Sequence, residues 1–266
     1  MKRYKIVGHP LNFCLSTPVM NALFEELGVE AEFETHDVPP EGLEAVMKTV
    51  RDGDLAGLIT TMPHKTPAIE YLDVLSDEAK AINAVNLVIR EASDFVGYNT
   101  DWLVALGAIQ SVTSDLKGVH ILVLGAGGAA RAAAYGFQKE GAEVSMWNRS
   151  PEKAKEFAES RGIEWVEDMR NWDKRPSIIV NATSMSYQPK QSTMVPFPLW
   201  EKVTCALDAV YGRTSLFLEE ARAAKVKTIM AGEVWYHYQA VPMFEILTGK
   251  IVPLEMVERY TKESLA

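Results

Sequence analysis

The segment VHILVLGAGGAARAAA, residues 119–134, constrains the fold more than any other part of this chain. An apolar run of strand type leads directly into Gly125, Gly127 and Ala130, which form a G-x-G-x-x-A pattern, and an alanine-rich helical run follows. A turn of this kind lets a pyrophosphate approach the backbone at the N-terminus of a helix. The alternative is a tight strand-to-helix turn without a ligand. We predict a dinucleotide-binding turn whose contacts come from Gly125, Ala126, Gly127, Gly128 and Ala129.

Strand-like and helix-like runs alternate throughout the second half of the chain. Strands are expected at residues 119–125, 142–148, 177–184 and 204–210, and helices at 131–141 and 153–162. This alternation predicts a Rossmann-type, doubly wound parallel sheet. Residues 185–200 contain three prolines and have no clean period, so we expect a long functional loop there.

The first half of the chain has its own α/β rhythm. Expected strands cover residues 4–8, 31–38 and 55–62, expected helices cover 18–28 and 41–53, and a close pair of short strands covers 85–91 and 94–99. A helix then starts after Thr100 or Asp101, either of which is a plausible N-cap, and two helical stretches at 233–249 and 254–265 close the chain. We expect two domains: 1–101 plus 236–266 for substrate and catalysis, and 102–235 for the cofactor.

Charge and composition exclude several classes of partner. A net charge of −9 offers no electrostatic footprint for nucleic acid or for an anionic membrane surface. No run of eighteen apolar residues occurs, and the two cysteines, Cys14 and Cys205, suggest neither a disulfide framework nor a metal site. The apolar run near the start is cut by His9 and Pro10 before it reaches signal-peptide length. We expect a cytoplasmic protein with a small-molecule ligand.

The residues after the second strand of the cofactor domain indicate which dinucleotide binds. An NAD site usually has an acidic residue there for the ribose hydroxyl. This chain instead has Asn148, Arg149 and Ser150, with Lys153 one turn further on. Arginine binds a ribose phosphate through charge-assisted hydrogen bonds, so we predict NADP as cofactor. A solvated surface arginine is the alternative, but it does not explain the missing acid.

The first half of the chain contains three short motifs: MPHK, which ends in Lys65, NAVN, which ends in Asn86, and GYNTD, which ends in Asp101. They are followed later in the chain by GAGGAARA, NRS, NATS, DAVY and YQA. In this order and at this spacing, the motifs resemble the shikimate dehydrogenase family over nearly the whole chain. The resemblance implies a substrate domain, an NADP domain and an active site in the cleft between them. It also implies that Lys65 is catalytic and that Asp101 is its partner.

The chemistry of such a reaction explains these two residue types. When hydride leaves NADPH for a ring ketone, the oxygen becomes an alkoxide that needs a proton or a nearby positive charge. Lys65 can supply either, and a nearby Asp101 would orient it and keep it charged. Taken alone, Lys65 is an exposed lysine after a proline and Asp101 is a helix cap.

The resemblance also implies several binding residues. Substrate contacts are expected from Ser16, Thr17, Thr61, Asn86, Tyr211 and Gln239, and further cofactor contacts from Thr183 and Gly232. Each of the substrate residues also has an ordinary structural explanation, such as an asparagine turn or a strand threonine. His64 is interpreted as a neighbour that shapes the lysine loop, and Trp235 and Tyr236 as packing residues.

The chain departs from the family pattern around the expected substrate. The family has two early hydroxyls before a proline, whereas this chain reads FCLSTPVMN. Alignment on Pro18 places Leu15 and Thr17 at those positions; alignment on Gly8 and Pro10 places Cys14 and Ser16 there. The chain departs from the family at three further positions. It has Ile59 where the family commonly has asparagine, Ala231 where the family has aspartate and Trp235 where the family has methionine.

These observations predict an NADP-dependent oxidoreductase of the shikimate dehydrogenase type, and the resemblance implies the shikimate pathway of aromatic amino acid biosynthesis. It would interconvert a ring hydroxyl and a ketone on shikimate or a close cyclic polyhydroxy carboxylate, as a divergent family member rather than the housekeeping biosynthetic enzyme. Quinate or another relative as substrate, and a catalytically idle NADP-binding sensor, are the alternatives. A one-carbon folate dehydrogenase does not account for the order of the motifs. The expected assembly is a homodimer.

Overall fold

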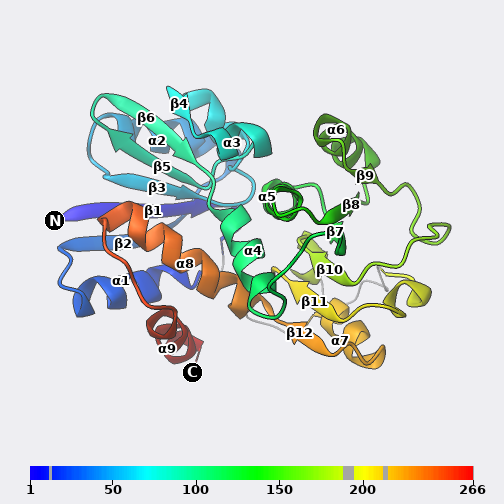
Figure 1. Cartoon of the computed structure of the whole chain (residues 1–266). Helices are drawn as coiled ribbons and strands as arrows, with labels where there is room; N and C mark the ends of the chain where they lie inside the picture. Colours follow the sequence, from blue (N-terminus) through cyan, green and yellow to red (C-terminus); the bar gives the residue numbers. More distant parts are fainter. Residues whose placement is uncertain (12–13, 188–194, 212–214, 266) are drawn as a thin grey trace. The chain divides into compact units, whose positions relative to one another are not determined.

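A computed structural model describes residues 1–11, 14–187, 195–211 and 215–265 (Figure 1). The chain forms two compact units. Unit 1 comprises Met1–Thr100 with Gln239–Ala266, and unit 2 comprises Asp101–Tyr238. All six tryptophans of the sequence, at positions 102, 147, 165, 172, 200 and 235, belong to unit 2.

Unit 1 is built on a six-stranded mixed sheet with the order β2-β1-β3-β5-β6-β4. Its strands are β1 Lys2–Gly8, β2 Ala31–Asp37, β3 Gly57–Thr60, β4 Val74–Leu75, β5 Leu87–Glu91 and β6 Asp94–Tyr98. Strands β2 and β3 pair with β1 in parallel, and β5 pairs antiparallel with both β3 and β6. The expected pair of short strands is therefore confirmed as an antiparallel hairpin.

The helices of unit 1 cover this sheet with apolar side chains. They are α1 Ser16–Glu26, α2 Leu43–Arg51, α3 Asp77–Ile82, α9 Leu254–Leu265 and the later part of α8 Gly232–Thr248, with 3₁₀ turns η1 Pro40–Gly42 and η2 Pro67–Tyr71. Met47 and Val50 of α2 pack in one core cluster with Leu58 of β3. Near β1, the Phe24 ring of α1 lies between the Tyr4 and Phe244 rings, with centroid distances of 6.0 and 5.6 Å.

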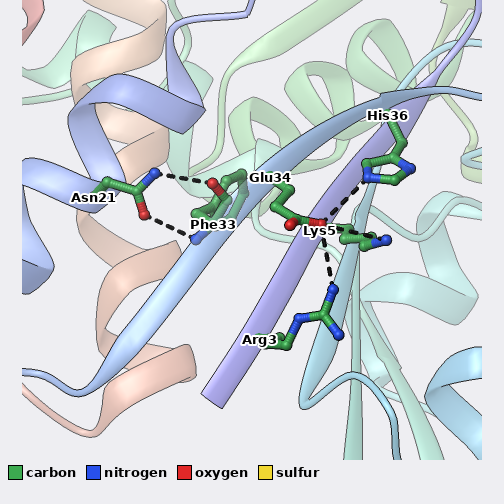
Figure 2. A network of polar contacts seen from close by, with 6 residues as sticks. All are labelled: Arg3, Lys5, Asn21, Phe33, Glu34 and His36. Atoms are coloured by element: carbon green, nitrogen blue, oxygen red, sulfur yellow. Dashed lines mark hydrogen bonds and ion pairs between the residues drawn. The ribbon is translucent and has the colours of Figure 1, made fainter. Parts of the chain in front are cut away.

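Polar side chains protect the edge strand β2 (Figure 2). The Asn21 amide of α1 accepts a hydrogen bond from the Phe33 N–H at 2.8 Å and donates one to the Phe33 carbonyl at 2.9 Å. Glu34 lies 3.3 Å from the Lys5 ammonium and 3.7 Å from the Arg3 guanidinium. The edge backbone at Phe33 is therefore satisfied by a side chain of the same unit.

Unit 2 is built on a six-stranded, fully parallel sheet with the order β12-β11-β10-β7-β8-β9. The strands are β7 His120–Leu124, β8 Glu143–Trp147, β9 Glu164–Trp165, β10 Ile178–Asn181, β11 Cys205–Asp208 and β12 Thr228–Met230. The first strand of the unit lies at the centre and the chain winds outward on both sides, which is the doubly wound order. The predicted fold class is confirmed.

Helices of unit 2 contribute to two separate core clusters. They are α4 Asp101–Gln110, α5 Gly128–Lys139, α6 Pro151–Arg161, α7 Leu216–Ala223 and the first part of α8, with 3₁₀ turns η3 Ser184–Tyr187 and η4 Phe197–Trp200. One cluster joins α4 and α5 to alternate strand residues such as Ile121 and Val123, and the other joins η4 and α7 to Leu122 and Leu124. This alternation shows that both faces of β7 are buried.

Some expected boundaries and elements differ from the structure. Strand β3 ends at Thr60 rather than at residue 62, because the chain turns at Met62 and Pro63. Five further elements are present that the sequence did not predict: β4, β9 and β12, which have two or three residues each, and helices α3 and α7. The expected loop 185–200 overlaps the turn η3, which begins at Ser184, and ends with the turn η4; residues 188–194 lie outside the described ranges. Among the described residues, no helix is long and apolar enough to cross a membrane.

Candidate functional site

Lys65 lies in a turn that follows the fully buried strand β3. The Thr61 N–H donates to the Val7 carbonyl at 2.9 Å, which joins the start of this turn to β1. The Lys65 carbonyl accepts a hydrogen bond from the Val85 N–H at 2.7 Å, which joins its end to the segment before β5. Backbone hydrogen bonds therefore hold both ends of the turn, and the Lys65 side chain is half-buried between them.

His64 is fully buried beside Lys65. Its Nε2 lies 2.7 Å from the Val38 carbonyl, so this nitrogen carries the proton and donates it. Its backbone N–H donates to the Thr61 carbonyl at 2.7 Å. The interpretation of His64 as a residue that shapes the lysine loop agrees with these contacts.

Asn86 and Thr100 are buried partners within unit 1. The Asn86 side-chain oxygen accepts from the Thr100 N–H and its Nδ2 donates to Thr100 Oγ1, both at 2.9 Å. The Asn86 carbonyl also accepts from the Thr60 N–H at 3.0 Å. Thr100 occupies the position before α4, whose first residue, Asp101, is fully buried. Asn86 therefore links β3 to the residue that precedes Asp101.

The early hydroxyl residues lie at the start of α1. Ser16 is buried, and the Thr17 hydroxyl pairs with the Thr35 hydroxyl of β2. Leu15 is fully buried, whereas Cys14 is only half-buried. Strands β1 and β3 are parallel neighbours, so the segments that leave them at Gly8 and Thr60 emerge at the same edge of the sheet. The chain that leads to Ser16 and the Lys65 turn therefore begin side by side.

The remaining expected binding residues lie on or near α8. Gln239 is half-buried on this helix and belongs to unit 1. In unit 2, a Cβ on Gly232 would lie 2.2 Å from the Val210 carbonyl carbon and 2.4 Å from the Tyr211 nitrogen. Only glycine fits there, and its absent side chain lets α8 begin directly against the backbone before Tyr211. Trp235 and Tyr236 are buried, as expected for packing residues.

The glycine turn between β7 and α5 has the geometry that a dinucleotide requires. Gly125 has φ +117°, and a Cβ there would lie 3.0 Å from the Ala182 carbonyl oxygen. Gly127 is the N-cap of α5, and nothing lies within 4 Å of where its Cβ would be. Ala130 is fully buried and packs close to Gly125. The open space over Gly127, at the N-terminus of α5, fits a pyrophosphate.

The carboxyl end of β8 carries the expected phosphate-binding residues. The Asn148 amide donates to the Ser150 carbonyl at 2.7 Å and stabilises the turn into α6. Arg149, Ser150 and Lys153 are exposed. Within the described ranges, neither Arg149 nor Lys153 forms an ion pair. The Gly125 N–H donates to the Trp147 carbonyl at 2.7 Å, so this turn adjoins the glycine turn.

A buried polar cluster at the ends of β10 and β11 was missed by the sequence analysis. It consists of Asn181, Asp208 and Ser215, and it holds Thr183. The motifs NATS and DAVY contain two of its members, and a polar residue at the end of an apolar strand was the available signal. The described residues contain no group of three or more His, Cys, Asp or Glu side chains that could hold a metal ion.

Known proteins resemble this chain over its whole length. Residues 6–88 match the model of the shikimate dehydrogenase substrate binding domain, and residues 108–194 match that of shikimate / quinate 5-dehydrogenase. A shikimate dehydrogenase (NADP(+)) of Aquifex aeolicus is 34% identical over 98% of this chain and 96% of its own. A shikimate dehydrogenase (NADP(+)) of Thermus thermophilus is 35% identical over 100% of this chain and 99% of its own.

Solved structures give the same result. A crystal structure of shikimate dehydrogenase from Aquifex aeolicus has a TM-score of 0.91 and 32% identity, and covers 98% of both chains. The shikimate 5-dehydrogenase of Thermus thermophilus in complex with NADP(H) and shikimate has a TM-score of 0.88 and 34% identity, and covers both chains completely. From its motifs, its fold and these full-length similarities, the chain belongs to the shikimate dehydrogenase family.

Proposed function

We propose that this protein is an NADP-dependent shikimate dehydrogenase that interconverts shikimate and 3-dehydroshikimate. The observation that carries the proposal is the similarity to proteins named shikimate dehydrogenase (NADP(+)) over the full length, which includes both units. The presence of Lys65 in the motif MPHK and of Asp101 in the motif GYNTD speaks against a catalytically idle sensor.

NADP, when bound, supplies or accepts the hydride. The N-terminus of α5 and the backbone of Gly125, Ala126, Gly127, Gly128 and Ala129 would hold its pyrophosphate. Arg149 and Lys153, which are exposed at the end of β8, would hold the ribose phosphate together with Asn148 and Ser150. Thr183 and Gly232 complete the proposed cofactor contacts.

Lys65 is the proposed proton donor to the oxygen that becomes an alkoxide when hydride arrives. In the reverse direction its neutral amine would accept the hydroxyl proton, and the resulting ammonium would stabilise the alkoxide as hydride leaves. Asp101 is the proposed partner that orients the ammonium group. The backbone of the turn that carries Lys65 is fixed by hydrogen bonds, so the Cα of Lys65 is already in place before the substrate binds.

The proposed substrate contacts come from Ser16, Thr17, Thr61, Asn86, Tyr211 and Gln239. The complete burial of Leu15 favours the alignment in which Cys14 and Ser16 occupy the positions of the two early hydroxyls. Ile59 is also buried, with 1% of its surface exposed. With one hydroxyl and one asparagine lost, we expect shikimate to bind more weakly than to typical family members, because each lost hydrogen bond costs about 1 to 3 kcal/mol.

The test is a scan of NADP and NAD reduction by purified protein against shikimate, quinate and close analogues. We expect the highest rate of oxidation with NADP and shikimate among all combinations of cofactor and substrate. Preferred oxidation of quinate would replace the proposed substrate, and absence of any turnover would favour a binding protein. We also propose a cytoplasmic location, which the two free cysteines support, and a homodimer, which light scattering would test.

A further inference from the structure

We infer that Asp208 is a positioning residue. Its hydrogen bonds fix the positions of two loops of unit 2, one that binds the cofactor and one that binds the substrate. This inference rests on the proposed function, in which Thr183 contacts NADP and Tyr211 contacts the substrate. Asp208 is the last residue of β11, next to Asn181 at the end of β10, and both are fully buried.

The Asp208 carboxylate accepts hydrogen bonds from neutral donors on three segments. Its Oδ1 accepts from Asn181 Nδ2 at 3.2 Å and from the Val210 N–H at 3.1 Å. Its Oδ2 accepts from the Ser215 hydroxyl. These donors lie at the end of β10, just after β11 and at the N-cap of α7, so a single side chain joins the three segments.

One arm of this arrangement leads to the cofactor loop. Asn181 Oδ1 accepts hydrogen bonds from the Thr183 N–H at 3.1 Å and from the Thr183 hydroxyl at 2.7 Å. The Asn181 amide is thus used on both sides, with its nitrogen directed at Asp208 and its oxygen at Thr183. The next residue, Ala182, has its carbonyl oxygen 3.0 Å from where a Cβ on Gly125 would lie. The Asn181 arm therefore fixes Thr183 beside the glycine turn.

The other arm leads to Tyr211. Val210 and Ser215 flank the segment that contains this tyrosine, and both donate to Asp208. The start of α8 at Gly232 packs against the same backbone. Asp208 therefore accepts hydrogen bonds from Val210, which directly precedes Tyr211, and from Ser215, which also caps α7 by accepting from the Leu218 N–H at 3.3 Å.

The experiment compares Asp208→Ala, Asp208→Asn, Asn181→Ala and Ser215→Ala by NADP titration, by steady-state kinetics with shikimate and by thermal unfolding. Asp208→Ala is expected to raise both the Kd for NADP and the KM for shikimate by about tenfold or more. Asp208→Asn should restore both constants to within about threefold of wild type, because its amide oxygen still accepts at the Oδ1 position and its nitrogen can donate to Ser215 Oγ.

The other two variants should each change mainly one of the two constants. Asn181→Ala should raise mainly the Kd for NADP, and Ser215→Ala should raise mainly the KM for shikimate, each by about threefold to tenfold. Ser76→Ala is the matched control, because Ser76 caps α3 in unit 1 by accepting from the Ala79 N–H at 3.1 Å without a carboxylate partner. It should lower the Tm and leave both constants unchanged.

A purely structural role would lower the Tm of the Asp208 variants and leave both constants within about twofold of wild type, which would overturn the inference. If Asp208→Ala does not fold, the single-arm variants decide: equal effects of Asn181→Ala and Ser215→Ala on both constants would also overturn it. A wild-type protein that fails to oxidise shikimate refutes the proposed function instead, and the NADP titration still tests the cofactor arm.

Discussion

Lys65 lies in a turn whose backbone is held by main-chain hydrogen bonds. The bonds of Thr61 to Val7 and of Val85 to the Lys65 carbonyl do not depend on the lysine side chain. Replacing that side chain should therefore leave the turn intact. Arg149 is exposed beyond the end of β8, so its side chain can also be replaced without disturbing the fold around it.

Lys65→Ala should lower kcat by about a hundredfold or more, which is the usual contribution of a placed general acid or base. The Kd for NADP should not change, since the proposed cofactor residues belong to unit 2. Lys48→Ala, which removes an exposed lysine of α2, is the control and should retain full turnover. A Lys65→Ala protein with near-normal kcat would show that Lys65 is an ordinary surface lysine.

Arg149→Ala should weaken NADP binding by about tenfold to a hundredfold, because a charge-assisted hydrogen bond contributes about 1.5 to 3 kcal/mol. NAD binding should hardly change, since NAD lacks the ribose phosphate. Titration of both dinucleotides into the variant measures the two effects. Arg170→Ala, at another exposed arginine of unit 2, should affect neither. Equal losses for NADP and NAD would exclude Arg149 as the phosphate ligand.

Cys14→Ser and Leu15→Ser distinguish the two alignments of the early hydroxyls. Cys14→Ser should lower the KM for shikimate severalfold, because a hydroxyl forms the hydrogen bond that a thiol forms poorly. Leu15→Ser should instead cost about 2 to 5 kcal/mol of stability, because a fully buried leucine is lost, and should bring no kinetic gain. The opposite pair of results would support the alignment on Pro18.

At the scale of elements, the regular parts of the fold were predictable and the short parts were not. The apolar strand before Gly125 and the helix after it show the expected periodicities. The alternation of strands and helices along the chain predicts the doubly wound sheet. Strands of two or three residues, such as β4 and β9, are too short to show a period. The motifs located the lysine turn and the glycine turn, but the hydrogen bonds of Asp208 depend on adjacent strand ends, which no local pattern reveals.

Helix α7 carries a carboxyl group whose ionisation opposes folding. Burial raises the pKa of Glu220 to about 7, against the effect of the Val195 backbone N–H, which favours the charged form. The folded state thus keeps this proton at pH values where the unfolded chain has lost it. Stability from this group is therefore present below about pH 4.5 and falls as the pH rises towards 7.

Glu220→Gln should remove this dependence. The variant should be more stable than wild type above pH 7, by on the order of 1 to 3 kcal/mol, and the difference should shrink towards pH 5. Thermal unfolding across this pH range measures it. Glu219→Gln, at the exposed neighbour, serves as the control for the loss of one charge. A stability difference that does not vary with pH would contradict the assignment.

At the scale of the whole molecule, the chain leaves unit 1 after Thr100 and returns to it at Gln239. The returning segment is bound to the first one at several points. The Tyr4 hydroxyl donates to the Leu247 carbonyl at 2.7 Å, the Lys250 ammonium donates to the Leu27 carbonyl at 2.7 Å, and Arg259 pairs with Glu26. Unit 1 therefore depends on residues that follow all of unit 2 in the sequence and are synthesised after it.

Deleting residues 250–266 should destabilise unit 1 and leave the core of unit 2 intact. All six tryptophans belong to unit 2, so their fluorescence reports on its unfolding, whereas far-UV circular dichroism reports on both units. In the truncated protein, the dichroism signal should begin to change at a lower temperature than the fluorescence signal. Coincident transitions that both shift downward would instead show that the two units unfold as one.

The two hydrogen bonds between the Asn21 amide and the Phe33 backbone affect whether two copies of this protein can pair through β2. An uncovered edge strand is a template on which a second chain can add a strand and continue the sheet. At Phe33, both backbone groups that would bind such a strand are already used by the Asn21 amide. A strand added along β2 would have to break two hydrogen bonds before it formed its own. A single side chain, Asn21, therefore opposes the addition of a strand to β2 at Phe33.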